Sequence, residues 1–172
     1  MTQEEYELLK ELLLKDLCAR LPYGVIGQCE IDASYDTSFD TKPQTHKFNA
    51  VVYGLKDDSL LVSPMIENQD ELEFANEEIA DGVDILDFKP YLFPMSSMTD
   101  EQCHKFYCRF VENEIDYNDF KKYYFDSCSW NKVLTLISDC GDIIDWFNEN
   151  HFDYRGLIEK VLAIDATGLN IY

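Results

Sequence analysis

Basic residues are scarce in this chain of 172 residues, which has 14 Lys and Arg against 34 Asp and Glu and a formal net charge of −20 at pH 7. A surface with this balance repels nucleic-acid phosphates and anionic lipid headgroups. The composition therefore disfavours direct binding to nucleic acid or to a membrane. It is typical either of a surface that is acidic only for solubility or of a negative face that docks on a basic protein partner.

Glycine is also scarce, with 7 residues, so a phosphate-cradling loop is not expected. The chain contains no Walker loop, no GxGxxG, GxSxG or HExxH motif, and no EF-hand pattern. Catalysis requires a convergent set of reactive groups, and no such set is visible. We therefore predict no catalytic residue, no cofactor and a protein that is not an enzyme.

Long apolar runs are missing too, and none reaches the length needed to cross a bilayer. The N-terminal segment MTQEEYELLKELLLKDL is acidic and amphipathic, unlike the basic start of a signal peptide. We therefore expect a cytoplasmic protein. Disulfides are rare in that compartment and no CxxC pair is present, so the cysteines are expected to be free thiols that mostly fill the core. The six cysteines are Cys18, Cys29, Cys103, Cys108, Cys128 and Cys140.

What the chain does have is ample material for a core, since 46% of its residues are hydrophobic and 14% are aromatic. Thr2 and Glu5 form a capping box, which predicts a helix that begins there and ends before Pro22. After this helix, the spacing of the hydrophobic residues changes to the two-residue period of a β-strand. Residues 24–35 predict a strand with a bulge at Gly27.

The central part of the sequence predicts a small sheet. Residues 48–66 have the pattern of a hairpin with a turn at residues 56–59, and residues 83–88 alternate as a last strand. Residues 36–45 are expected to form a loop, and the acidic residues 67–82 either a loop or a short helix. Several short strands with tight turns indicate a small bent sheet or an SH3-like barrel.

A stiff joint with sequence KPYLFPMSSMT separates this sheet from the rest of the chain. Pro90 and Pro94 are expected to prevent the preceding strand from continuing as a central one. Thr99 and Gln102 form a second capping box, and Met98 precedes it at the staple position. The joint is thus predicted to set how a helical half leaves the β half.

The final third of the sequence predicts helices. An apolar stripe with helical spacing runs through residues 103–111. Another helix is expected to end near Asn150, and Asp153 is expected to cap a further helix whose apolar residues, from Leu157 onward, face inward.

The predicted fold class is therefore α+β. It consists of an N-terminal helix, a small antiparallel SH3-like β-barrel or bent sheet, and a helical C-terminal half. We expect one compact domain over residues 1–172, with the helix and the β part in residues 1–94 and the helical part in residues 95–172.

Two features supply candidate contact residues. One is the aromatic joint, whose simpler interpretation is a set of internal pins between the halves. The other is the polar motif at residues 150–156, whose simpler interpretation is a corner between two helices with Phe152 packed inward. The candidate interaction surface comprises Tyr91, Phe93, Met95, Met98, His151, Asp153 and Arg155.

The residues that suit a metal ion do not form a complete set. His104 and Cys108 share a helix face beside Cys103, which is half of a zinc site without its supporting ligands. Carboxylates also recur at near-helical spacing in Asp139, Asp142, Asp145 and Glu149. Such groups can hold Mg²⁺ or Ca²⁺, but acidic residues make up about a fifth of the chain and meet at this spacing by chance. We predict no metal site.

Three segments resemble an uncharacterised protein family of gut Bacteroidales bacteria, their phages and prophages. They are LKDLCARLPYGV near the start, KPYLFPMSSMT in the middle and WFNENHFDYRGLIEKVLAIDATGLNIY at the end. Residues 30–82 and 112–140 carry much less of the resemblance. The resemblance implies a small intracellular protein from phage or mobile DNA, and it implies no activity and no catalytic residue.

The leading hypothesis is a non-enzymatic intracellular interaction protein of phage or prophage origin, with a protein partner for which a basic surface is the complementary choice. One alternative is an acidic mimic of nucleic acid that inhibits a host DNA-binding protein. Another is a metal-dependent enzyme built on His104, His151 and nearby acids. The sequence makes no prediction of the oligomeric state.

Overall fold

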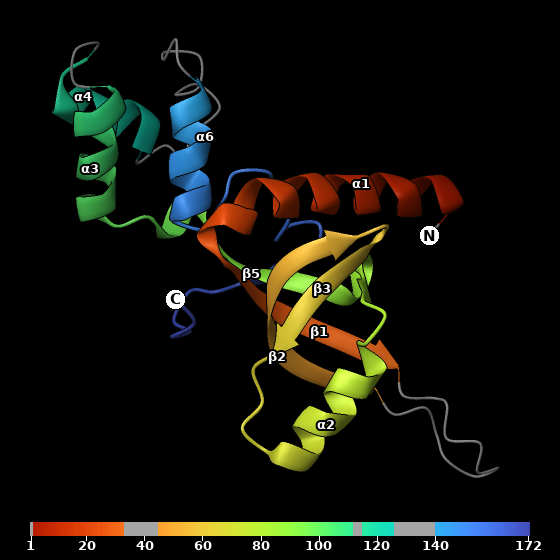
Figure 1. The fold of residues 1–172 in the computed structure, drawn as a ribbon. Helices are drawn as coiled ribbons and strands as arrows, with labels where there is room; N and C mark the ends of the chain where they lie inside the picture. Colours follow the sequence, from red (N-terminus) through yellow and green to blue (C-terminus); the bar gives the residue numbers. More distant parts are fainter. Residues whose placement is uncertain (1, 33–44, 112–114, 126–139) are drawn as a thin grey trace. The chain divides into compact units, whose positions relative to one another are not determined.

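The computed structural model describes residues 2–32, 45–111, 115–125 and 140–172 (Figure 1). The chain divides into two compact units. Unit 1 comprises residues 1–92 and 157–172, and unit 2 comprises residues 93–156. The first change of unit lies close to the division expected at residue 94, but the last sixteen residues belong with the β part and not with the helical part.

Unit 1 begins with the predicted helix, α1 (Gln3–Arg20). The capping box is confirmed, because the Glu5 N–H donates to Thr2 Oγ1 at 3.2 Å and the Thr2 N–H donates to the Glu5 carboxylate at 2.7 Å. The α-helix gives way to the 3-10 turn η1 (Leu21–Tyr23), where Pro22 cannot continue it.

The strands form an open sheet in the order β4-β3-β2-β1-β5-β6, with β7 pairing a second part of β5. Their bounds are β1 (Val25–Asp32), β2 (Thr45–Lys56), β3 (Ser59–Pro64), β4 (Val83–Asp84), β5 (Phe88–Pro94), β6 (Phe152–Asp153) and β7 (Ile164–Asp165). The α+β class and the N-terminal helix are confirmed. SH3-like closure is not confirmed, because in the part of the chain that the structure describes the end strands β4 and β6 do not pair with each other.

The predicted hairpin is confirmed in β2 and β3, which join through a two-residue turn with Asp57 at φ 53°. The register shifts between Val52 and Gly54, so the bulge lies in this hairpin and the one predicted at Gly27 is wrong. Gly27 pairs regularly with Ala50. A Cβ at Gly27 would collide with the ring of Phe88, so close packing explains the glycine.

The expectation that two prolines exclude a central strand is wrong, because β5 contains both and lies between β1 and β6. This strand changes neighbours along its length. It pairs with β1 through residues 88–90, with β7 through Tyr91 and Leu92, and with β6 through Phe93 and Pro94. Each proline therefore falls at the end of a short ladder, where a missing N–H interrupts little.

The core of unit 1 lies between α1 and the sheet. Leu13 and Leu17 of α1 share one buried cluster with inward residues of the strands, such as Cys29, Val52 and Leu60. The acidic segment forms a helix, α2 (Gln69–Glu78), and a 3-10 turn η2 (Ile85–Asp87) follows β4. Of the loop expected at residues 36–45, only Thr45 lies within the described residues, where it begins β2.

Unit 2 is helical, as expected. Its elements are the 3-10 turn η3 (Met95–Ser97), α3 (Asp100–Phe110), α4 (Tyr117–Phe120), the π-helical turn η4 (Lys121–Phe125) and α6 (Cys140–Glu149). The second capping box is confirmed, with the Gln102 N–H donating to Thr99 Oγ1 at 3.2 Å. Met98 is buried in the same cluster as the first apolar residues of α3.

The helix predicted after Asp153 is wrong. Asp153 pairs with Pro94 in β6, and residues 154–163, all of which the structure describes, form successive turns. Val161 has φ 61°, which interrupts a right-handed helix. Leu157 and Leu162 still face inward, but they do so from turns that belong to unit 1.

Candidate functional site: a pocket between β2 and α2

Unit 1 contains a pocket of about 360 Å³ between the start of β2 and the first half of α2. Its volume is at the small end of the range for ligand sites, which suits a side chain or a small molecule. The pocket is lined by His46, Lys47, Phe48, Ile66, Asp70, Glu71, Phe74 and Ala75.

Aromatic rings from both elements meet in this pocket. The ring centroids of His46 and Phe74 lie 4.8 Å apart with a tilt of 47°, and Phe48 contributes a third, partly buried ring. The faces of the two phenylalanine rings carry negative potential and attract cations. The aromatic lining of the pocket is thus both apolar and suited to a positively charged group.

Local structure in α2 sets the positions of the pocket's carboxylates. The Asn68 side chain caps the helix by accepting from the N–H groups of Asp70 and Glu71 at 3.0 and 3.3 Å. Helical spacing then places Phe74 one turn further on, on the same side as Asp70. Ala75 is 1% exposed and packs inward, whereas Asp70 and Glu71 of the first turn are exposed.

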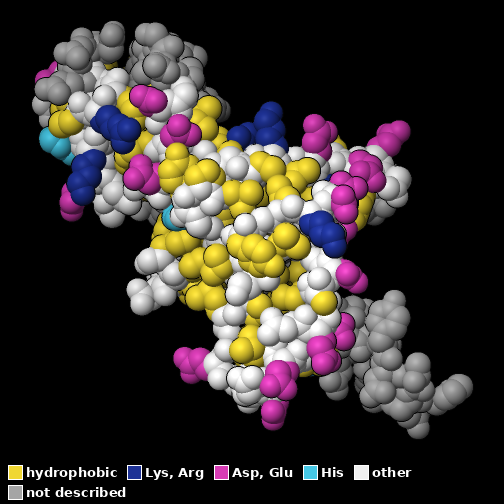
Figure 2. Space-filling model, in the orientation of Figure 1, with side chains coloured by type: hydrophobic (Ala, Val, Ile, Leu, Met, Phe, Trp, Pro, Cys, Tyr) yellow, Lys and Arg dark blue, Asp and Glu magenta, His cyan; other side chains and the backbone are white. Residues whose placement is uncertain are grey.

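The charge of this region is strongly one-sided. Asp70 and Glu71 are exposed, and within the described residues neither carboxylate makes an ion pair. Lys47, which also lines the pocket, pairs with Glu30 of β1 at 2.9 Å. Residues 57–88 contain eleven Asp and Glu and no Lys, Arg or His. Figure 2 shows acidic side chains gathered over α2, at the bottom of the view.

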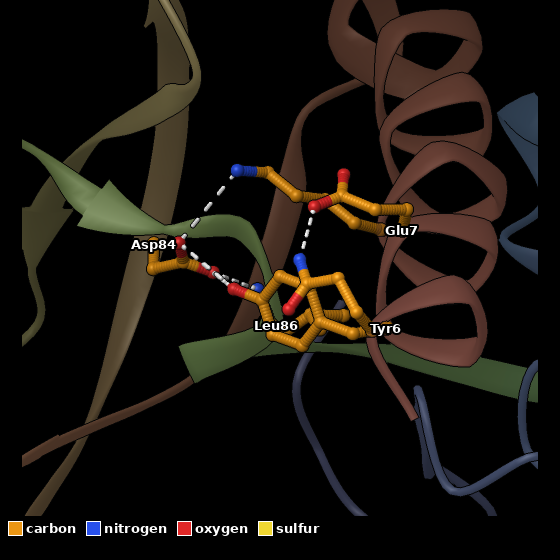
Figure 3. A network of polar contacts seen from close by, with 6 residues as sticks. Tyr6, Glu7, Asp84 and Leu86 are labelled. Carbon is orange, nitrogen blue, oxygen red and sulfur yellow. Dashed lines mark hydrogen bonds and ion pairs between the residues drawn. The ribbon is translucent and has the colours of Figure 1, made fainter. Parts of the chain in front are cut away.

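Another carboxylate in unit 1, that of Asp84, contacts side chains of α1 (Figure 3). The Tyr6 hydroxyl donates to the Asp84 carboxylate at 3.3 Å, Lys10 Nζ lies 3.8 Å from it, and the Leu86 N–H donates to it at 2.9 Å. Partial desolvation and the charge of Asp84 raise the pKa of Tyr6. Because Asp84 makes these contacts with Tyr6, Lys10 and Leu86, we assign it a structural role.

Asp87 lies near Asp84 and is exposed at the surface. Local desolvation, together with the charges of Asp84 and Glu30, raises the pKa of its carboxyl group. Desolvation also raises the pKa of the buried Cys29 thiol to about 12. Cys29 therefore stays protonated and unreactive in the folded protein.

The residues predicted as an interaction surface lie mostly inside the molecule. Tyr91 is 6% exposed, and its hydroxyl donates to Asn49 Oδ1 at 2.8 Å in unit 1. The hydroxyl of Tyr172 donates to the Tyr91 carbonyl at 2.9 Å, and burial raises the pKa of Tyr172 to about 12. Tyr91 thus ties strand β5 to its neighbours.

The other candidates belong to unit 2. Met98 is 4% exposed, and Phe93 and Met95 are partly buried against the same aromatic cluster. His151 and Asp153 are each 8% exposed, and the guanidinium of Arg155 stacks on Tyr154 at 4.8 Å. Met98, His151 and Asp153 are thus buried within unit 2, and a role of these residues in partner contact stays a prediction.

The corner at the end of α6 is confirmed in part. Asn150 ends the helix with its side-chain amide donating to the Trp146 carbonyl at 2.8 Å, and His151 turns the chain with φ 55°. Phe152 is 1% exposed and packs inward, as predicted. The segment that follows is a strand, so this is a helix-to-strand corner.

The half zinc site is present as a pair. Cys108 Sγ lies 3.5 Å from His104 Nδ1 on the exposed face of α3, while Cys103 is fully buried. Among the described ranges no group of three or more His, Cys, Asp and Glu is placed to hold a metal ion. Asp142, Asp145 and Glu149 are exposed on α6, and Asp139 lies outside the described residues.

Cys18, Cys29, Cys103 and Cys108 are free thiols, as predicted, and the side chains of Cys128 and Cys140 lie outside what the structure describes. In the four described ranges, no helix combines the length and the apolar character needed to cross a bilayer. Comparison of the chain with protein-family models, with curated proteins and with solved structures gives no match.

The pocket residues are not among the candidates drawn from the sequence. The one local signal is the acidic segment 67–82, in which Phe74 stands alone as an aromatic residue. Its ring partner, His46, is 28 positions earlier, and no local pattern predicts that these two residues meet.

Proposed function

We propose that the protein is a non-enzymatic binding protein that docks a basic segment of another protein on the α2 face of unit 1. The main supporting observation is the pair of exposed carboxylates, Asp70 and Glu71, which line the pocket and make no ion pair among the described residues. A partner that supplies positive charge there gains both an ion pair and apolar burial.

The surrounding charge supports this choice of partner. A stretch of eleven carboxylates without one base repels anionic ligands and steers cationic ones toward the pocket. The net charge of −20 adds a long-range term of the same sign, which salt screens. A basic protein segment therefore fits this face better than a nucleic acid or a lipid headgroup.

The test is fluorescence anisotropy with a labelled eight-residue peptide in which four arginines alternate with glycines. We expect binding that weakens as salt is raised. The double variant Asp70→Asn/Glu71→Gln should weaken binding about fivefold or more, because it removes both charges.

A matched control changes two exposed carboxylates of α1, Glu4→Gln/Glu11→Gln, which alters the net charge equally. If this control weakens binding as much as the α2 variant, the attraction is that of the whole acidic protein and the proposal is wrong. Absence of binding to the wild-type protein at low salt would also overturn it.

The nucleic-acid mimic is a narrower form of this proposal, in which the basic partner is a DNA-binding protein. Displacement of duplex DNA from such a protein by the wild-type chain, and not by the α2 variant, would support it. Binding without displacement would leave only the broader proposal. We further propose, from the sequence resemblance, a cytoplasmic protein of phage or prophage origin.

A further inference from the structure

We infer that the β2–α2 pocket holds one arginine side chain of the partner, with its guanidinium between the aromatic rings and the carboxylates of Asp70 and Glu71. This inference rests on the proposed function and specifies its site and its preferred residue. It follows from three features of the pocket, which are the rings, the position of the free negative charge and the shape of the lining.

The rings favour a flat cation. His46 and Phe74 come within 4.8 Å with a tilt of 47°, and Phe48 adds a third ring on the same strand as His46. A guanidinium is planar, delocalised and weakly hydrated, so it stacks on aromatic faces with little loss of solvation. A lysine ammonium is compact and strongly hydrated, and it loses more on entering such a pocket.

The two carboxylates favour a ligand whose hydrogen-bond donors point in several directions. Asp70 and Glu71 are adjacent in the first turn of α2, so their side chains diverge around the helix axis. The five N–H donors of a guanidinium can reach two separate acceptors and still present a face to a ring. Lys47 does not occupy this position, because its ammonium binds Glu30 at 2.9 Å.

The shape of the lining favours a long side chain with an apolar stem. Among the lining residues Ile66 and Phe74 are partly buried and Ala75 is buried, whereas Asp70 and Glu71 are exposed. An arginine stem of three methylene groups can bury against apolar surface while its head remains among polar groups. A small inorganic cation would leave this apolar lining unused.

The experiment compares two peptides of equal charge, the arginine peptide described above and its counterpart with four lysines. The wild-type protein should bind the arginine peptide about fivefold or more tightly, and amide shifts in the ¹H–¹⁵N spectrum should concentrate at residues 46–48 and 66–75. A citrulline peptide, which keeps the shape without the charge, should not bind measurably.

Phe74→Leu keeps an apolar side chain and removes the ring, so it should abolish the preference for arginine while binding of the lysine peptide changes little. His46→Ala, at an exposed position on β2, is a second variant that does not disturb the core and should reduce the same preference. Tyr53→Leu, which removes a ring 67% exposed elsewhere on β2, is the matched control and should have no effect.

Equal affinities of the two peptides for the wild-type protein would overturn the inference, as would a preference that survives in both Phe74→Leu and His46→Ala. If both peptides nevertheless lose affinity in Asp70→Asn/Glu71→Gln, the proposed function stands and only the arginine pocket is wrong. If neither peptide binds the wild-type protein, both proposals are wrong.

Discussion

The two units of this chain build their cores from different side chains. In unit 1, one of the sixteen buried residues of the described core cluster is aromatic, namely Phe88, and the others are mostly Leu, Val, Ile and Ala. In unit 2, six of the ten buried residues of the described cluster are aromatic. These six are Phe106, Tyr107, Phe120, Trp146, Phe147 and Phe152.

The difference follows from the secondary structure of each unit. A sheet covered by a helix brings many small and branched side chains into register, so burial is spread over many residues. Short helices have few backbone contacts with each other and need large side chains to fill the space between them. Stability should therefore be distributed in unit 1 and concentrated in a few rings in unit 2.

The largest expected effect is that of Phe106→Ala in unit 2. The ring of Phe106 is fully buried and lies 5.2 Å from Trp146 and 5.6 Å from Phe147, between centroids. Its removal should cost about 3–5 kcal/mol of unfolding free energy, because it leaves a cavity and deletes ring–ring contacts.

This prediction can be measured one unit at a time, because the described side chains of each unit include one buried and one exposed cysteine. Cys29 and Cys103 are fully buried in units 1 and 2, and Cys18 and Cys108 are exposed. The measurement is alkylation of the thiols at increasing urea concentration, with Cys128 and Cys140 replaced by Ser. In Phe106→Ala, Cys103 should become reactive at a clearly lower urea concentration than Cys29. Simultaneous opening of both thiols would mean that the two cores do not unfold separately.

The next largest effect is expected at the one buried ion pair of α1. Arg20 Nε donates to Asp16 Oδ2 at 2.7 Å, and both side chains are 0% exposed. Asp16→Ala leaves a buried guanidinium without its carboxylate and should destabilise the protein by about 3 kcal/mol. It should open Cys29 earlier than Cys103, the reverse of Phe106→Ala.

A double replacement tests whether this pair is an exception in an otherwise apolar core. Asp16→Leu/Arg20→Met removes both charges together and should restore most of the lost stability, because no charge is left buried. Chemical denaturation gives the free energies of unfolding. A double variant as unstable as Asp16→Ala would show that Arg20 contributes through its packing or its other contacts instead.

The elements that the sequence predicted correctly depend on neighbouring residues. Both capping boxes involve side chains three positions apart, and the β2–β3 turn is formed by the adjacent residues Asp57 and Asp58. The alternation of residues 48–66 is likewise local. The α+β class follows from these signals, because each element displays its own period.

The errors concern residues whose surroundings come from distant parts of the chain. Pro90 is tolerated in β5 because pairing with β1 ends there, and β7, more than seventy positions later, takes over at Tyr91. The closeness of Gly27 to Phe88 has the same origin. The candidate pocket could not be predicted for this reason also, since His46 and Phe74 belong to separate elements whose contact depends on the completed fold.

The smallest expected effect is at Asp87, where local desolvation and the charges of Asp84 and Glu30 oppose ionisation of the carboxyl group. The raised pKa means that the folded state holds the carboxyl proton more tightly than the unfolded chain does. The favourable contribution of the protonated group is therefore present at low pH and is lost as pH rises through the folded pKa. At pH 7 the ionised Asp87 opposes folding.

Asp87→Asn removes the ionisable group and should raise the free energy of unfolding at pH 7 by about 0.5 kcal/mol or less, as is usual for a surface site. The gain should shrink as the pH falls below the ordinary range for a carboxyl group, because wild-type Asp87 is then protonated in both states. Thermal unfolding at a series of pH values gives the difference. Asp58→Asn, in the exposed β2–β3 turn, makes the same charge change and is the control for removing one negative charge from the surface. A gain that is equal at all pH values would mean that the asparagine acts through a new hydrogen bond and not through relief of charge.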